Sequence, residues 1–199
     1  TGLQLVGSGW MLQGSSLNLD GFGAEIVVRV GDGSADGAAS SATIASDIRG
    51  DATLVKDDLG TLVLTGTGSW QHGTVVRNGT LQVGDGGTTG AMIGDVRNAG
   101  TLVFDRGDAV DFAGAISGAG TLAQAGGGTL RLTGDSSAFS GTTQVRAGTL
   151  EVDGALGGAL AVQSGATLQV GNGGTAGVIA GNVANAGTLA FNRSDAVSF

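Results

Sequence analysis

One short phrase recurs along the chain at intervals of about 20 residues: a glycine, then Thr-Leu, a variable residue and an apolar residue. It is clearest at 60–66 and 128–134, with the sequences Gly-Thr-Leu-Val-Leu-Thr-Gly and Gly-Thr-Leu-Arg-Leu-Thr-Gly. Because this period is too short for a pair of helices, it predicts a solenoid of stacked β-strands. The leucines of the phrase are Leu62, Leu81, Leu102, Leu122, Leu130, Leu150, Leu168 and Leu189. One step in this series is short, the eight residues from Leu122 to Leu130, and an equal step separates Leu54 from Leu62.

Apolar residues alternate with other residues inside each phrase. In one copy Leu150 and Val152 flank Glu151, and the other copies keep the same order. Since successive side chains of a strand point to opposite faces, we expect the outer pair to point inward and the middle residue outward.

One rung cannot bury its own inward side chains, but stacking buries them against the same positions of the next rung. If each inward leucine contributes roughly 1.5–3 kcal/mol on burial, several rungs are needed before the core outweighs the loss of chain entropy. We therefore predict an all-β chain folded as a right-handed parallel β-helix, a β-solenoid with rungs of about 20 residues.

Two other solenoids fit the sequence less well. A leucine-rich repeat requires Leu-x-x-Leu-x-Leu, which 59–64 satisfies, but Asn78 and Ala147 stand three residues before Leu81 and Leu150. A calcium-binding nonapeptide roll requires Gly-Gly-x-Gly-x-Asp every nine residues, whereas the partial matches here lie 87 residues apart.

Longer repeats are superimposed on this period. The segment 48–74 matches 116–142 at an offset of 68 residues, and 81–112 matches 168–199 at an offset of 87. We expect a single β-helical fragment over 1–199, with rungs of weaker pattern at 1–47 and repeat modules at 48–80, 81–112, 116–152 and 168–199.

Two segments of the chain carry further expectations. Residues 34–41 are small and polar, so we expect a protruding loop there. The last repeat stops at Phe199 where its twin continues, so we expect a fragment cut within a longer solenoid.

Composition narrows the partners of the chain. A formal net charge of -8 argues against nucleic acid and anionic membranes. No apolar run approaches the ~20 residues that span a bilayer, so we expect no membrane insertion, and any targeting signal lies outside this sequence. The absence of cysteine argues against disulfides and thiolate metal sites.

The repeats resemble a known family. Residues 60–66, 73–74 and 78–83, and again 120–122, 128–134, 139–143 and 147–152, are similar to the passenger-associated transport repeat of bacterial autotransporters, the proteins of type V secretion. The resemblance covers 48–199, and 24–47 looks like the same kind of passenger. The first copy departs from the family pattern, since Trp70-Gln71-His72-Gly73-Thr74 stands where the family has an aromatic residue, x and Gly-Gly-Thr.

This resemblance implies a β-helical stalk exported by a C-terminal outer-membrane β-barrel translocator, which is absent from this chain. It implies a place at the cell surface of a Gram-negative bacterium, or secretion from it. In the family the repeat is linked to efficient secretion and folding of the passenger. Physically, rungs that stack one at a time let an extended chain fold beyond the membrane, and each added rung resists backsliding.

The integrin-binding tripeptide Arg-Gly-Asp occurs twice, and we treat its residues as receptor-binding candidates although so short a motif also arises by chance in a glycine-rich chain. The repeat partners of the two sites are Ser117-Gly118-Ala119 and Arg193-Ser194-Asp195. Since the second pair keeps Arg and Asp, it predicts a salt bridge within a turn. The candidates are Arg49, Gly50, Asp51, Arg106, Gly107 and Asp108.

Signals of catalysis are weak. His72 is the one histidine, so a Ser-His-Asp triad would have to use it, and we expect a solvated side chain instead. The Gly-Asp-Ser-Ser sequence at 134–137 occupies a turn after a strand, and one histidine without cysteine cannot build a usual zinc site. Acidic residues at 57–58 and 105–111 fall in repeat turns and lack the spacing of a calcium cage, so we expect neither a metal nor a cofactor.

The two tryptophans, Trp10 and Trp70, are expected to fill the core or cap it.

Three functional hypotheses remain. The first is a non-enzymatic stalk of an autotransporter passenger that supports folding-coupled secretion and acts in adhesion or self-association, through contacts with host cells or other copies. The second is a spacer within an enzymatic passenger, a protease or esterase. The third is a host-receptor ligand that uses an Arg-Gly-Asp turn.

Overall fold

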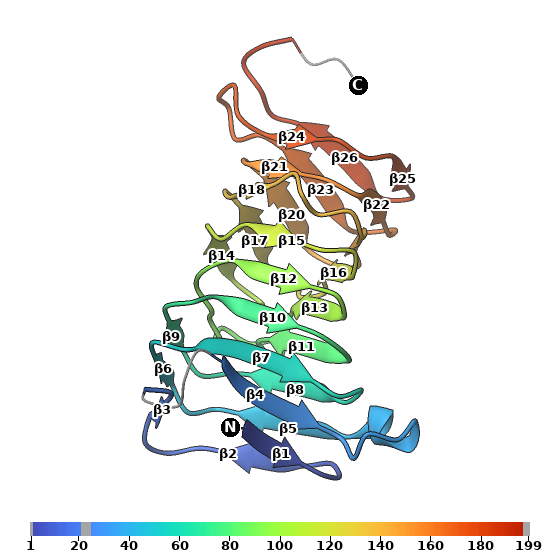
Figure 1. Ribbon diagram of the computed structural model, residues 1–199. Helices are drawn as coiled ribbons and strands as arrows, with labels where there is room; N and C mark the ends of the chain where they lie inside the picture. The colour runs from blue at the N-terminus through green and yellow to red at the C-terminus, as the bar shows by residue number, and fades with distance from the viewer. Residues whose placement is uncertain (1, 21–24, 197–199) are drawn as a thin grey trace.

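The computed structural model describes residues 2–20 and 25–196, and within them parallel strands stack into a single column (Figure 1). The repeat module at 168–199 therefore ends in residues that lie outside this description. The β-solenoid with rungs of about 20 residues is confirmed, with about eight turns. The single helical element among these described residues is the four-residue 3-10 helix η1 (Asp36–Ala39), within the segment expected to protrude as a loop.

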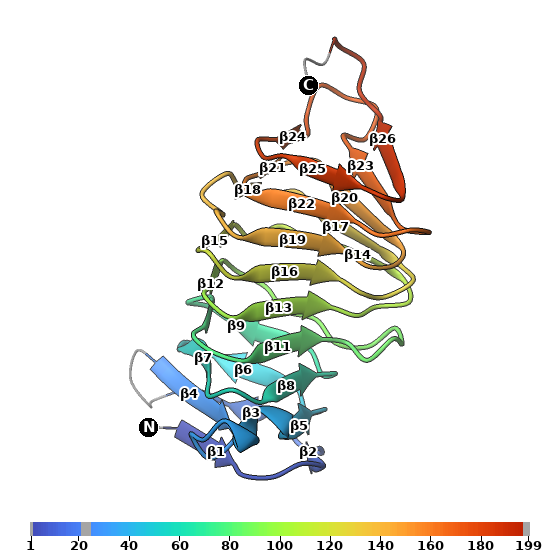
Figure 2. The ribbon, with the colours of Figure 1, turned by 90° about the vertical axis from the view of Figure 1, so that its right-hand side faces the viewer.

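Each rung contributes strands to three faces. We call face 2 the nine-stranded sheet of order β2-β5-β8-β11-β13-β16-β19-β22-β25, which runs the height of the column (Figure 2). Its strands are β2 (Trp10–Leu12), β5 (Ser41–Ile44), β8 (Thr61–Leu64), β11 (Thr80–Val83), β13 (Thr101–Phe104), β16 (Thr121–Gln124), β19 (Thr142–Val145), β22 (Ala159–Val162) and β25 (Val183–Asn185).

Face 1 precedes face 2 in each rung and is made of two sheets in succession. The first contains β1 (Gly2–Leu5), β4 (Glu25–Val30), β7 (Thr53–Asp57), β10 (Thr74–Val76), β12 (Val96–Asn98) and β15 (Ile116–Ser117). The second contains β18 (Asp135–Ser136), β21 (Ala155–Leu156) and β24 (Val178–Ile179). The two meet where the Ile116 N–H donates to Ser136 Oγ at 2.9 Å.

Face 3 follows face 2 in each rung and also has two sheets. The first contains β3 (Leu17–Asn18), β6 (Ile48–Gly50) and β9 (Gly68–Trp70), and a parallel bridge from Thr67 to Ala91 extends it by one rung. The second contains β14 (Ala109–Phe112), β17 (Thr129–Leu132), β20 (Thr149–Val152), β23 (Thr167–Val170) and β26 (Thr188–Phe191).

The leucine ladders lie in register, as the spacing predicted. On face 2 Leu62 pairs with Leu81 and Leu81 with Leu102, and all three are buried. On face 3 Leu130, Leu150 and Leu168 form an equivalent stack. One continuous cluster of buried apolar side chains runs from Leu5 to Leu168, so the core follows the whole column.

The short steps in the leucine series are corners of the coil. Leu54 lies on face 1 and Leu62 on face 2, while Leu122 lies on face 2 and Leu130 on face 3. The same phrase therefore forms strands on two different faces. Because 68 and 87 residues each exceed a whole number of 20-residue rungs by about a third, every repeat copy is turned by one face relative to its twin.

The middle residues of the phrases point outward, but neighbours cover several of them. Val103 and Glu151 are buried, whereas Val63, Gln82 and Arg131 are partly exposed. Each outward residue stands between the equivalent residues of the rungs above and below, about 4.8 Å away, so exposure is lower than for an isolated strand.

Candidate binding surfaces

The three faces differ in charge. No residue of the nine strands of face 2 is charged, although the chain has 26 charged residues, 9 basic and 17 acidic. Face 1 carries Glu25, Arg29, Asp57 and Arg77, which line or border an open groove of about 400 Å³. Within this group Arg77 forms an ion pair of 2.7 Å with Glu25.

Face 3 carries a ladder of charges centred on Arg131. Its guanidinium lies 2.9 Å from Glu151, 3.6 Å from Asp153 and 3.8 Å from Asp111. Asp111 and Glu151 stand on the strands either side, in register with Arg131. The hydrogen bond and charge of Glu151 raise the pKa of Arg131, and the ladder stabilises three successive rungs.

The second Arg-Gly-Asp tripeptide forms a closed contact, which we call the arginine clasp. Arg106 Nε and one terminal nitrogen donate to both carboxylate oxygens of Asp108, at 2.9 and 2.8 Å. The same guanidinium also donates to the main-chain oxygens of Thr88, at 2.6 Å, and of Gly90. Arg106 is only 11% exposed, and it fastens the loop that follows β11 to the rung above.

The repeat partner forms the same clasp on another face. Arg193 donates to both oxygens of Asp195, at 2.9 and 2.8 Å, and to the main-chain oxygen of Gly177. The predicted salt bridge within a turn is therefore confirmed in both copies. A receptor that engaged Arg106 would have to displace four hydrogen bonds.

The first tripeptide is more open. Arg49 and Gly50 belong to β6 between two neighbouring strands, and the Arg49 side chain is 63% exposed beside Asp47. The Asp51 N–H donates to Asp20, and its main-chain oxygen contacts Nδ1 of His72. Receptor binding by these residues stays a prediction, which cell binding by the double variant Arg49→Ala and Arg106→Ala would test.

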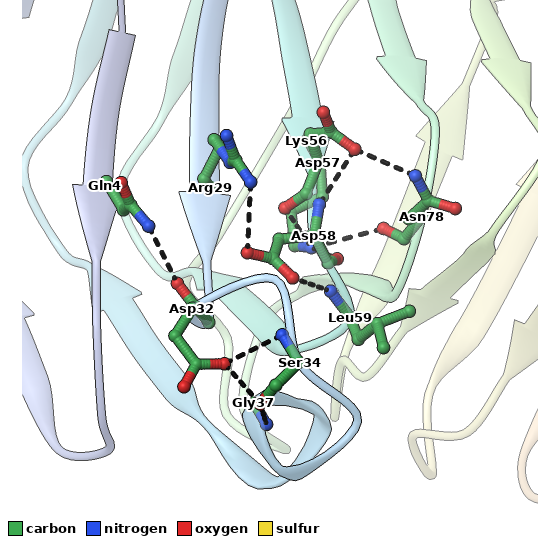
Figure 3. Close-up of polar contacts among 11 residues, drawn as sticks. Gln4, Arg29, Asp32, Ser34, Gly37, Lys56, Asp57, Asp58, Leu59 and Asn78 are labelled. Atoms are coloured by element: carbon green, nitrogen blue, oxygen red, sulfur yellow. Dashed lines mark hydrogen bonds and ion pairs between the residues drawn. The ribbon is translucent and has the colours of Figure 1, made fainter.

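Sequence reasoning missed a buried lysine at the corner between faces 1 and 2. Lys56 is 0% exposed, and its Nζ donates to the main-chain oxygens of Asp58, Asp57 and Asn78 at 2.7, 2.9 and 3.2 Å (Figure 3). Asp58 has a positive φ of 67°, and its carboxylate accepts from the Leu59 N–H and faces Arg29 at 3.6 Å. Burial lowers the pKa of Lys56 to about 8, while Asp58 and Asp57 oppose this shift.

The repeat partner of Lys56 shows what the corner requires. Gln124 occupies the equivalent position, is buried, and donates from Nε2 to the main-chain oxygens of Gly126 and Gly128, at 2.9 and 3.2 Å. Both side chains satisfy carbonyls that a tight corner turns into the core. The alignment of a lysine with a glutamine at an inward position was the signal in the sequence.

The described residues do not assemble the catalytic groups considered from the sequence. His72 is exposed, as expected, in the turn after β9. Ser136 is buried on β18, several rungs away, and its hydroxyl accepts from Ile116. Among residues 2–20 and 25–196, no group of three or more His, Cys, Asp or Glu side chains is placed to hold a metal ion.

The two tryptophans have different environments. Trp70 is fully buried and its Nε1 donates to Thr74 Oγ1 at 3.0 Å, so it fills the core as expected. Trp10 is 52% exposed on the first rung, where its Nε1 donates to the Val6 main-chain oxygen at 2.8 Å. No helix in the described part of the chain has the length and apolar character that crossing a bilayer requires.

Comparison with known proteins agrees with this architecture. The model of the passenger-associated transport repeat matches residues 54–83 and 122–152. Each match covers five strands, β7 to β11 in the first copy and β16 to β20 in the second. The first match begins on face 1 and the second on face 2. No solved structure matches the chain.

The chain is also similar to the adhesin BmaC autotransporter of Brucella suis biovar 1 (strain 1330), with 40% identity over 103 residues. The match covers 51% of this chain and 3% of that protein, so the chain corresponds to a small part of its relative. Together with the repeat matches, it supports an autotransporter passenger with passenger-associated transport repeats.

Proposed function

We propose that this autotransporter passenger segment is a non-enzymatic structural stalk, displayed at the surface of a Gram-negative bacterium or secreted from it. In the full protein its partner would be a C-terminal outer-membrane β-barrel translocator. The stalk would support folding-coupled secretion and contribute to adhesion or self-association. The name of the adhesin relative supports an adhesive role.

The observation that carries the proposal is the unbroken stack of nine parallel strands on face 2. Each strand pairs in register with those of the rungs before and after it. The column therefore adds stability rung by rung and has no need of contacts between distant ends. A chain that leaves a translocator in extended form can then gain buried leucines as each rung stacks.

A change inside one rung tests the coupling of folding to export. Leu168 is buried on β23, and Thr167 is its outward neighbour on the same strand. With the chain fused ahead of an outer-membrane translocator, Leu168→Asp should lower the amount of protease-accessible passenger at the cell surface several-fold. Thr167→Asp is the matched control and should be exported like the wild type.

Two outcomes of that experiment contradict the proposal. One is export of Leu168→Asp at the wild-type level while the purified variant is unfolded by circular dichroism. The other is equal loss of export in both variants, which would mean that an added charge, rather than a lost core contact, blocks passage.

The alternative is a spacer within a protease or esterase passenger. Its support was limited to His72 and the serines at 136–137, which the structure places on different rungs. Hydrolytic activity of a longer passenger that His72→Ala abolishes would favour this alternative over the stalk.

A further inference from the structure

We propose that face 2 is a lateral docking surface for a second copy of this chain. The inference rests on the proposed function, because it assigns the surface through which a stalk of this kind would self-associate. It is carried by the contrast between face 2 and the other two faces.

Face 2 presents an uninterrupted ladder of hydroxyl groups. Its outward residues at the start of successive strands stand in register across six rungs, and none of them is charged. They are Ser41, Thr61, Thr80, Thr101, Thr121 and Thr142.

A second outward row lies two residues further along each strand and is partly exposed, except at Val103 and Ala123, which their neighbours cover. It consists of small, apolar or amide side chains, and no aromatic side chain points outward from β8 to β22. The row contains Thr43, Val63, Gln82, Val103, Ala123, Gln144 and Ala161. Charged residues follow the strands at the border, where the side chains of Asp105 and Arg146 hydrogen-bond Gln82 and Gln144 of this row.

This distribution has the pattern of an interface, with an uncharged centre and a charged rim. Two copies with a net charge of -8 each repel one another, and face 2 is where they can approach with the fewest charged groups between them, because its strands carry none. A neutral sugar would gain little there, since the central strands offer no outward aromatic ring for stacking.

The size of the surface fits a weak self-contact. With strands about 4.8 Å apart and about 13 Å long, the nine-stranded face covers roughly 500 Å² on each copy. Two such faces would bury about 1,000 Å², which is the lower limit for a specific interface. Because both copies would use the same face, the contact is isologous and closes as a dimer.

Sedimentation of the 199-residue chain over a concentration series tests the surface. We expect a reversible monomer–dimer equilibrium in the wild type. The double variant Val63→Lys with Ala161→Lys, which places positive charges on both copies of face 2, should weaken dimerisation at least tenfold.

The matched control is Val75→Lys with Ala190→Lys. It changes one valine and one alanine with the same partial exposure, on faces 1 and 3. It should dimerise like the wild type, and thermal melting should show that all variants keep the fold. A monomer at every concentration, or equal dissociation constants for the two double variants, would overturn the proposal.

Because the chain has no cysteine, crosslinking separates a lateral contact from an end-to-end one. Thr101→Cys lies at the centre of face 2, and Thr149→Cys occupies the equivalent ladder position on face 3. Under mild oxidation the first should form disulfide-linked dimers and the second should not. Crosslinking of neither variant at a concentration where the wild type dimerises would place the contact elsewhere, while the stalk role tested by export would be unaffected.

Discussion

Single residues at the corners decide whether a rung can turn from one face to the next. At the corner of faces 1 and 2, Lys56 supplies three hydrogen bonds to main-chain oxygens, and Gln124 supplies two in the repeat partner. Glycines allow neighbouring turns to approach closely. Gly79 has φ 64°, and a Cβ there would lie 2.5 Å from the main-chain oxygens of Asp58 and Gly60.

Lys56 gives the stability of the fold a distinctive pH dependence. Its pKa is about 8 in the folded chain, against an ordinary lysine pKa of 10.5. Between these values the unfolded chain holds a proton that the folded chain has lost, so the free energy of unfolding should rise with pH. Well below pH 8 both states hold the proton, so Lys56 adds no pH dependence to the free energy of unfolding there. Urea unfolding of the wild type and of Lys56→Gln between pH 7 and 11 should show the rise in the wild type alone, and parallel curves would contradict it.

The corner glycines differ sharply in how much they constrain the turn. Gly79→Ala combines a left-handed backbone with a clash against main-chain atoms, so we expect it to lower the free energy of unfolding by about 2 kcal/mol or more. Gly127→Ala is the matched control, because a Cβ there meets no atom within 4 Å. Equal unfolding midpoints in urea for the two variants would contradict a steric constraint at Gly79.

At the scale of strands and loops, the leucine spacing predicted the stacked strands, their register and their inward side chains. The pattern does not reveal which face a strand occupies, because the alternation in Leu62 and Leu130 is the same on faces 2 and 3. The offsets of 68 and 87 residues did contain this information, because each exceeds a whole number of 20-residue rungs by about one third of a rung, which is one face. Of the candidate site residues, the pairing of Arg106 with Asp108 was predictable from its repeat partner. Lysine is normally exposed, so the alignment with Gln124 was the one sign of the buried position of Lys56.

The arginine clasp should control the exposed loop that follows β11. Arg106→Ala removes the donors for Thr88, Gly90 and Asp108, so we expect several-fold faster limited proteolysis within 84–90. The control is Arg146→Ala, since the Arg146 guanidinium bonds only the neighbouring side chain of Gln144 among the residues that the structure describes, and this variant should be cleaved like the wild type. Cleavage of Arg106→Ala at the wild-type rate would contradict this role.

The clasp should also depend on pH. The hydrogen bond from Arg106 lowers the pKa of Asp108, so the clasp should persist above the ordinary Asp pKa and weaken as pH falls through the lowered value.

At the scale of the whole molecule, the chain is a three-sided column in which each repeat copy is turned by one face. Loops that belong to equivalent repeat positions, such as 84–95 and 171–182, therefore project from different corners. Face 2 differs from the other two faces in that its nine strands form one sheet and none of them carries a charged residue. The column thus combines variable corners with one constant side.

Removal of one complete rung tests the central claim most directly. Deletion of 149–166 joins Gly148 to Thr167, which pairs with Thr149 in the native register, so every later strand keeps its face. Deletion of 149–157 removes half as many residues and shifts every later strand off its face. The stacked-rung account predicts that the first variant keeps the β-sheet circular dichroism signal and a cooperative unfolding transition with a modest loss of stability, while the second loses cooperative unfolding. Equal damage from the two deletions would contradict it.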